Sequence, residues 1–355
     1  MNQRIAVSRI AIVIALIVVI VVAAVGLYYV YGNQSKTPAS KFKVAEIIPG
    51  YVNDQSYAEA GYQALMALNK TEHVQVAYTE NILSPTAAFQ TAVQQYISEG
   101  YNIIYLHGSQ FASAVGIAPN STGLSSQYPN VEFIVEADTA GQIPVAKNVW
   151  VIDRNFAPGF YVFGALAALV TNSDKVGFIS GQQLPFSNAE VNAAIIAMKT
   201  INPNLQFYRQ WVGDFTDPVK TGTAARTMIG LGVDVILSDQ NLGNPGLFQA
   251  VQGTNVLVAV KYTDQSSQAP SNYLTSYLYN FTPPLIYVYN QIASGHLSGY
   301  YRIPFSPTGG AYIQLPIMNV NQAVQTRIRG IIDGIVNGSI QVPWNTTNPG
   351  NGPSL

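Results

Sequence analysis

Residues 148–181 read NVWVIDRNFAPGFYVFGALAALVTNSDKVGFISG, and this stretch decides the fold class. Two short apolar runs, Val149–Ile152 and Val176–Ile179, flank a longer stretch with a helical pattern, Gly159–Leu169. Each run is continuously apolar rather than alternating, which is typical of a parallel strand in a sheet that is covered on both faces. The stretch therefore predicts a strand–helix–strand unit within a buried parallel sheet.

The same alternation continues on both sides of this stretch. Further β-branched runs lie at Val44–Ile48, Val74–Tyr78, Ile103–Leu106, Val131–Val135, Val233–Leu237 and Val256–Val260, and helical patterns lie at Ser56–Leu68, Thr86–Glu99, Ala189–Thr200 and Val219–Leu231. A second series of strand–helix units begins near Val176, after the first series has ended at Ile152. This division predicts an α/β fold with two doubly wound parallel-sheet lobes rather than one closed eight-stranded barrel.

The composition limits the possible functions. A chain of 355 residues is long enough for about two domains. Its formal net charge is -1 and it has no cluster of Lys and Arg, so nucleic acid is not an expected partner. The absence of cysteine excludes disulfides, thiolate metal sites and a lipid-modified cysteine. Only 10% of residues are charged, against about 25% in ordinary globular proteins, which favours harsh or acidic surroundings.

An uncharged apolar segment near the N-terminus predicts a membrane anchor. Residues Ile10–Tyr31 contain no charged side chain, and a helix of about 20 apolar residues spans a bilayer. Arg4 and Arg9 precede it, which places residues 1–9 in the cytoplasm. Residues 32–41 are then a polar linker, and the remainder lies on the extracellular side of the cell membrane. Cleavage after the small residues near Gly26 is the alternative, in which case the segment is a signal peptide.

Candidate site residues follow from the predicted topology. In open α/β sheets, ligands bind beyond the carboxyl ends of the strands. The segments at those ends are Asn53–Tyr57, Ser109–Phe111, Glu136–Asp138, Gln182–Phe186, Ser238–Asn241 and Lys261–Gln265, and within them we expect ligand contacts from Asp54, Tyr57, Ser109, Gln110, Asp138, Phe186, Asn241 and Asp264. Each residue alone also fits a solvated loop or a helix cap. Together they predict a cleft with aromatic rings and a few carboxylates and amides.

Motifs for catalysis or for metal binding are weak in this chain. His73, His107 and His296 do not have the spacing of metal ligands, and neither a G-x-S-x-G elbow nor a P-loop occurs. The His107–Ser109 sequence is better explained as a loop at a strand end than as part of a hydrolase. We therefore expect no metal, no cofactor and no enzymatic activity.

Asp54 is the acidic residue that most needs an explanation. Ser56 and Glu59 have the spacing of a capping box, so the helix that follows does not require Asp54 as a cap. This favours a ligand contact over a redundant cap. On this interpretation, Asp54→Ala abolishes binding and barely changes the melting temperature.

Several segments then resemble one known family. DQSYAEAGYQAL at 54–65, GYNIIYLHGSQF at 100–111, residues 148–181 and GDFTDPVKTGTAARTMIGLGVDVI at 213–236 are similar to the basic membrane protein family of ABC-transporter substrate-binding lipoproteins, of the purine-nucleoside receptor type. The likeness covers most of residues 43–343. It implies a type I periplasmic-binding fold with three crossings between the lobes. It also implies capture of a small solute, a purine nucleoside in the best-known members, and delivery to a membrane permease.

The resemblance also implies roles for individual residues. Asp54 matches the acid that binds the base, and Tyr62 approximates an aromatic that stacks on it. Leu237, Tyr262 and Tyr279 lie where the family has a stacking Phe, an Asp that holds the ribose and a Lys, so this chain departs from the pattern there. Gly243 lies in the glycine-rich ligand loop, and Asp264 is two residues beyond Tyr262. The departures leave the identity of the solute open.

The resulting hypothesis is a membrane-tethered, monomeric solute-binding protein of an ABC importer. Lobe 1 would comprise residues 42–153 and about 278–318, and lobe 2 residues 154–277 and about 319–343, with a disordered tail at 344–355. The alternative is a ligand-sensing ectodomain of the same fold that transports nothing. An extracellular enzyme and a structural surface protein are the remaining alternatives.

Overall fold

The computed structural model describes residues 41–139 and 141–350. From Phe42 onward the chain forms one compact unit. The predicted membrane span, Ile10–Tyr31, lies outside the described residues. Among the helices that are described, none is both long and apolar enough to cross a membrane.

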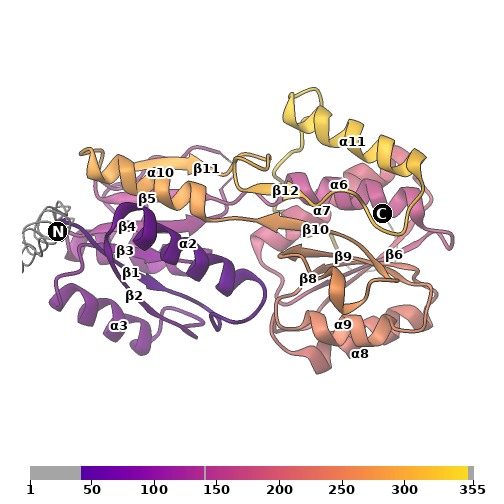
Figure 1. The fold of residues 1–355 in the computed structure, drawn as a ribbon, viewed down its shortest axis with the longest axis horizontal. Coiled ribbons are helices and arrows are strands. Elements are labelled where there is room, and N and C mark those ends of the chain that lie inside the picture. Colours follow the sequence, from indigo (N-terminus) through magenta and orange to yellow (C-terminus); the bar gives the residue numbers. More distant parts are fainter. Residues whose placement is uncertain (1–40, 140, 351–355) are drawn as a thin grey trace, which may run out of the picture. The chain divides into compact units, whose positions relative to one another are not determined.

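The described strands form two sheets of six, and each sheet builds one lobe (Figure 1). The first sheet has the order β11-β5-β4-β3-β1-β2, and all of its strand pairs are parallel. Its strands are β1 (Lys43–Ile47), β2 (Gln75–Thr79), β3 (Ile103–Leu106), β4 (Glu132–Ala137), β5 (Val149–Asp153) and β11 (Gly299–Arg302). The second sheet has the order β12-β10-β9-β8-β6-β7, with only β12 antiparallel to its neighbour. Its strands are β6 (Lys175–Ser180), β7 (Gln206–Trp211), β8 (Val235–Asp239), β9 (Leu257–Tyr262), β10 (Tyr273–Tyr279) and β12 (Ala311–Ile313).

Helices cover both faces of each sheet, as the continuously apolar strands predict. The first lobe contains α2 (Tyr57–Glu72), α3 (Ala87–Ser98), the 3₁₀ turn η1 (Ser109–Phe111), α4 (Ala112–Val115), α5 (Leu124–Gln127) and α10 (Thr282–Ala293). The second contains α6 (Ala157–Val170), α7 (Pro185–Ile201), α8 (Pro218–Gly230), α9 (Asn244–Val251), η2 (Ser266–Gln268) and α11 (Gln322–Val336). In β1, Val44 belongs to the core cluster beneath α2, whereas Ala45 belongs to the cluster beneath α3. In the second lobe, α6 and α7 cover one face of the sheet and α8 and α9 the other.

The fold class predicted from the sequence is therefore confirmed, but four strands did not stand out as apolar runs. They are β7, β10, β11 and β12. β7 and β11 are edge strands with polar or half-exposed side chains, and β12 has only three residues. These three strands lack the buried, continuous apolar pattern on which the prediction depends. β10 is buried, but Thr275 and Ser276 interrupt its apolar run.

Within the described residues the chain passes between the lobes three times, at residues 154–156, 280–281 and 303–310. The last crossing differs from the predicted division. Residues 311–313 were assigned to lobe 1, but β12 pairs with β10 of the second sheet. A strand of three residues carries too little pattern to indicate which sheet it joins.

The C-terminal segment also differs from the prediction of a disordered tail. Amide side chains of α7 bind its backbone: Asn192 Nδ2 donates to the carbonyl oxygens of Asn345 (2.8 Å) and Thr347 (2.9 Å), and Asn188 Nδ2 donates to that of Thr346 (3.2 Å). These amides satisfy carbonyl groups that an irregular segment cannot pair with itself. The described part of the tail is thus fixed on the second lobe.

A close approach of two helices gives a testable prediction. A Cβ atom added at Gly164 in α6 would lie 2.4 Å from the carbonyl oxygen of Ala194 in α7. Since backbone cannot yield like a side chain, we expect Gly164→Ala to cost about 1–3 kcal/mol of unfolding free energy. The matched control is Gly330→Ala in α11, where a Cβ meets no atom within 4 Å. Alanine's helix propensity should there stabilise by up to about 1 kcal/mol. Urea unfolding measures both; a stabilising Gly164→Ala would contradict the packing.

Candidate ligand-binding site

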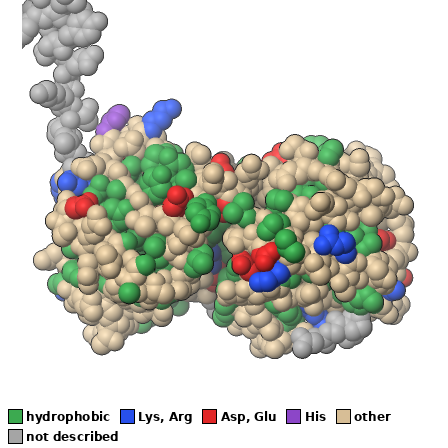
Figure 2. Space-filling view, turned by 90° about the horizontal axis from the view of Figure 1, so that it is seen from below, with side chains coloured by type: hydrophobic (Ala, Val, Ile, Leu, Met, Phe, Trp, Pro, Cys, Tyr) green, Lys and Arg blue, Asp and Glu red, His purple; other side chains and the backbone are tan. Residues whose placement is uncertain are grey.

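A cavity of about 350 Å³ lies between the two lobes. Its walls come from segments that follow β1, β2, β3, β6, β7 and β8, from residues at the start of α2 and the end of β9, and from the first crossing. Figure 2 shows the groove between the lobes on one face, with hydrophobic side chains along its edges and acidic and basic ones beside them. The cavity therefore lies where the strand ends of an open α/β sheet are expected to bind ligands.

The structure brings seven of the candidate residues predicted from the sequence to this cavity. They are Asp54, Tyr57, Ser109, Gln110, Phe186, Asn241 and Tyr262. Three of them, Tyr57, Phe186 and Tyr262, supply aromatic rings. The Tyr57 and Tyr262 rings, from different lobes, lie 5.0 Å apart between centroids.

Three other candidates lie in the protein core or on a surface away from the cavity. Leu237 is in the middle of β8 and is fully buried in the core. Tyr62 packs its ring against Tyr78, 5.0 Å away, on the partly exposed side of α2. Asp264 accepts hydrogen bonds from the Ser266 backbone and the Gln314 side chain. The sequence alone could not show that these side chains point away from the cavity. A shift of one residue along a strand or helix turns the side chain to another face, and the sequence pattern does not fix positions that closely.

Three further candidates support the cavity without lining it. Gly243 precedes α9, and its N–H donates to the Phe215 carbonyl oxygen at 3.2 Å. Asp138 forms an ion pair with Arg154, which does line the cavity. Tyr279 lies behind Arg154 and donates its hydroxyl to the Arg154 carbonyl oxygen at 3.0 Å.

Asp54 caps α2 as well as lining the cavity, which corrects the prediction that the helix does not need it. Its carboxylate accepts the backbone N–H groups of Ser56 (2.8 Å), Ala58 (3.1 Å) and Glu59 (3.0 Å). The predicted capping box is absent, because the Ser56 hydroxyl faces Asn241 at 3.4 Å and the Glu59 carboxylate accepts the N–H of Gln55. Burial raises the pKa of Asp54, and the three N–H donors partly offset this effect.

Arg154 is the main cavity residue that the sequence analysis missed. It follows β5 at the first crossing and is only 3% exposed. Its Nε donates to Asp138 Oδ1 (2.9 Å), its Nη2 to Asp138 and to the Ser109 hydroxyl (2.9 Å), and its Nη1 to the Tyr57 hydroxyl (2.9 Å). The guanidinium also lies over the Phe186 ring of the other lobe, 5.4 Å from its centroid. A charged residue directly after a buried strand, in a chain with so few charges, was the available signal.

A buried polar network in the first lobe holds Tyr57 in place. The Tyr57 hydroxyl donates to Glu136 at 2.6 Å, and the Tyr57 ring stacks on His107 with centroids 4.0 Å apart. The His107 ring nitrogens face the Tyr57 carbonyl oxygen (2.8 Å) and Glu136 Oε1 (2.5 Å). Burial acts to raise the pKa of Glu136, but His107 and Arg154 outweigh it and lower that pKa. Glu136 is therefore held as the anion of this network.

The backbone at Tyr262 is unusual. Its φ is +77°, in the left-handed region that a bulky residue rarely adopts. Such strain persists where the surroundings impose it, and it often marks a functional position. The next residue, Thr263, donates its hydroxyl to the carbonyl oxygen of Gln55 in the other lobe, and Gln55 also has a positive φ, of 53°. Gln55 thus takes part in a direct contact between the lobes, and Tyr262 lies next to it.

The arrangement suits binding of an organic molecule. The cavity wall combines aromatic rings with amides and hydroxyls that can accept or donate hydrogen bonds, which is typical of small-molecule sites. Among the described residues, no group of three or more His, Cys, Asp or Glu side chains could hold a metal ion.

Two doubly wound lobes with three crossings and a cavity between them define the class of two-lobed, type I solute-binding proteins. The chain belongs to the Bmp family, described as ABC transporter substrate-binding protein PnrA-like, which matches residues 41–346.

Individual relatives are distant but similar over most of their length. The chain is 23% identical over 325 residues to basic membrane protein B of Borrelia garinii subsp. bavariensis, covering 88% of this chain and 91% of that protein. A solved solute-binding protein of an ABC transporter system from Aeropyrum pernix K1 superposes with a TM-score of 0.71 at 16% identity, covering 85% of this chain and 94% of that one. The corresponding protein from Conexibacter woesei gives 0.64 at 22% identity, covering 86% and 99%. These structural likenesses show a shared fold.

The three hydrogen bonds of Asp54 predict a loss of stability on its removal. We expect Asp54→Ala to cost about 1–2 kcal/mol of unfolding free energy, because three N–H groups at the start of α2 lose their acceptor. Ser56→Ala is the matched control, since the Ser56 side chain makes no cap hydrogen bond. Chemical denaturation compares the two variants with the parent chain. A larger loss of unfolding free energy for Ser56→Ala than for Asp54→Ala would show that Ser56 caps α2, as the sequence predicts.

Proposed function

We propose that this chain captures a small solute in the cavity between its lobes and delivers it to an ABC permease in the membrane. The cavity carries this proposal: about 350 Å³ matches a small organic molecule, and both lobes contribute to its walls. Membership of a family of ABC transporter substrate-binding proteins supports the same role. A binding protein, rather than an enzyme, fits this family.

The protein would act outside the cytoplasm, as a monomer attached to the membrane. Its relatives are named basic membrane proteins. In this proposal the apolar segment Ile10–Tyr31 anchors the chain, because no cysteine is available to carry a lipid.

The side chains around the cavity favour an uncharged solute with a flat ring. Aromatic rings from both lobes can stack on such a ring. Arg154 already places its Nε and Nη2 on Asp138, and Asp54 already accepts three backbone N–H groups. Asp214, which also lines the cavity, accepts hydrogen bonds from the Thr216 N–H and hydroxyl at 2.8 Å each. These charges are largely satisfied within the protein, so they do not call for a charged ligand. Purine nucleosides are the first solutes to test, although Tyr262 stands where the family has an acidic residue.

The test begins with the full chain purified without added ligand. Denaturation followed by mass spectrometry shows whether a solute was carried through purification. Thermal shift is then measured with adenosine, guanosine, sugars and short peptides. A released nucleoside, or a melting temperature raised by nucleosides, supports nucleoside transport. A shift with another class changes the solute, and no response to any of them favours the sensing ectodomain.

Two aromatic substitutions connect binding to this cavity. We expect Phe186→Ala to weaken binding of the responding solute by about tenfold or more, because the lost ring contact costs roughly 1.4 kcal/mol. Tyr62→Ala, which removes an aromatic ring on the other side of α2, should leave the affinity within about twofold. Isothermal titration calorimetry measures both. Equal losses in the two variants would place the binding site elsewhere.

A further inference from the structure

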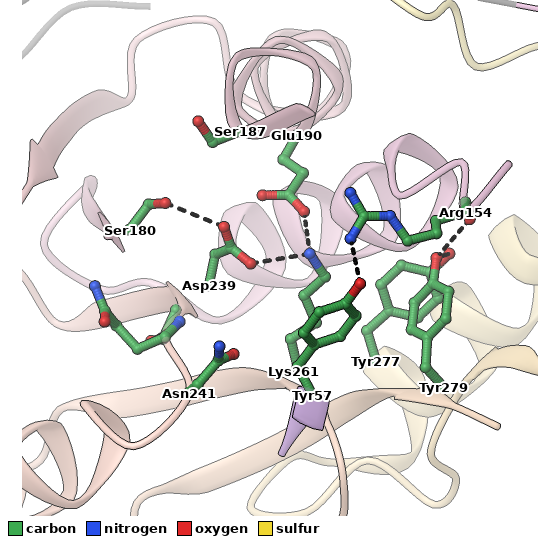
Figure 3. Close-up of polar contacts among 12 residues, drawn as sticks. Tyr57, Arg154, Ser180, Ser187, Glu190, Asp239, Asn241, Lys261, Tyr277 and Tyr279 are labelled. Atoms are coloured by element: carbon green, nitrogen blue, oxygen red, sulfur yellow. Dashed lines mark hydrogen bonds and ion pairs between the residues drawn. The ribbon is translucent and has the colours of Figure 1, made fainter. Parts of the chain in front are cut away.

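A second buried charge cluster lies beneath the cavity in the second lobe. Lys261 Nζ donates to Asp239 Oδ1 at 2.9 Å and to Glu190 Oε1, and all three side chains are at most 1% exposed. The ammonium group also lies 3.3 Å from the centroid of the Phe156 ring. Figure 3 shows Lys261 between the two carboxylates, with Tyr57 and Arg154 nearby. We call Lys261, Glu190 and Asp239 the Lys261 cluster.

Each member of the Lys261 cluster is close in sequence to a residue that lines the cavity. Glu190 is one helical turn after Phe186 in α7, and Asp239 ends β8 two residues before Asn241. Lys261 directly precedes Tyr262 in β9. Lys261 therefore connects three separate segments of the cavity wall without contacting the cavity itself.

The Lys261 cluster has more acidic groups than basic ones. One ammonium faces two carboxylates, and a net charge buried at this depth is costly. Asp239 has donors for both oxygens, from Lys261 and from the Ser180 hydroxyl at 3.0 Å. Glu190 Oε2 is buried and has no hydrogen-bond partner in the described residues. A proton is therefore best accommodated on Glu190, and burial followed by the neighbouring Asp239 raises the pKa of Glu190 well above its ordinary value.

The other titratable groups that face the cluster do not supply the missing charge. They are the hydroxyls of Tyr262, Tyr277 and Tyr279, with Arg154 beyond Tyr262. Burial raises the pKa of each of these tyrosines, so they stay neutral. Arg154 pairs with Asp138 instead.

We propose that Lys261 is the positioning residue of the ligand cavity: it holds α7, β8 and β9 together through its bonds to Asp239 and to a protonated Glu190. This inference rests on the proposed function for its meaning in ligand binding. It adds that the cavity wall is assembled while Glu190 holds its proton and loosens when Glu190 loses it.

The direction of the pH effect follows from linkage. The folded state binds the Glu190 proton more tightly than the unfolded chain does, so stability from this group is complete below the ordinary pKa of Glu, about 4.3. That stability is lost as pH rises through the raised value in the folded protein. An acid-favoured cavity is consistent with a chain in which only 10% of residues are charged.

The first test needs no solute. Hydrogen–deuterium exchange, corrected for the intrinsic rate, is measured over residues 182–190 of the full chain at about pH 5 and about pH 9. We expect protection of this segment to fall about tenfold at the higher pH in the parent chain, and to fall much less in Glu190→Gln, whose amide cannot ionise. The control is Glu132→Gln. Glu132 is a buried acid of the first lobe, also with an unpartnered Oε2, and burial raises its pKa to about 7. The Glu132→Gln variant should change how the melting temperature depends on pH, but not how the exchange protection of residues 182–190 depends on pH.

The second test removes the interaction of Lys261 with its carboxyl partners. Lys261→Met alone leaves an uncompensated buried carboxylate and can prevent folding, so the decisive variant is Lys261→Met with Asp239→Asn, which removes both charges together. We expect this variant to fold, to lose about tenfold in protection of residues 182–190 at pH 5, and to bind guanosine, used as the probe, at least about tenfold more weakly. Unchanged protection of residues 182–190 in this variant would overturn the inference. If the parent chain binds no solute but the exchange results hold, the proposed function fails and the positioning role stands.

Discussion

The ion pair of Arg154 with Asp138 is the interaction on which the cavity depends. Arg154 lies at the first crossing between the lobes, and its donors reach the ends of β3 and β4 and the start of α2. Its guanidinium also lies over Phe186 in α7 of the other lobe. Removal of either partner would leave a buried charge, which typically costs 3–5 kcal/mol, roughly a third or more of a domain's stability. One residue thus fixes the floor of the site and joins the lobes.

The second lobe also has buried ion pairs next to the cavity, with Lys261 as the cation in place of Arg154. Arg154 and His107 are matched by carboxylates in the first lobe, and Lys261 is matched by Glu190 and Asp239 in the second. In a chain with only 10% charged residues, several of the charges are therefore placed in or behind the cavity wall. Their partners within the protein orient the wall segments, and aromatic rings, amides and hydroxyls line the cavity beside them. This internal pairing explains how a site built with ionised groups can suit an uncharged ligand.

The sequence predicted the general architecture well because burial on both faces leaves a clear pattern in parallel strands. It also located seven cavity residues, because parallel topology brings strand ends to one edge. It did not find Arg154, whose partners are 16 to 97 residues away and visible only in three dimensions. Asp54 was misjudged for a related reason: spacing suggested that Ser56 would cap α2, but cap geometry depends on where the preceding loop places its oxygens. Leu237 and Tyr62 were misplaced because a resemblance fixes a position in the alignment more readily than the direction of a side chain.

In the proposed role, a small solute binds between the lobes, against Tyr262, Arg154 and Phe186. A crystal structure of the protein, either purified without added ligand or soaked with the solute that raises its melting temperature, tests this binding. We predict density for one organic molecule in the interlobe cavity, with a ring that contacts Tyr262 or Phe186. Density for the solute in the groove between α6, α7 and α11, with only water between the lobes, would contradict it.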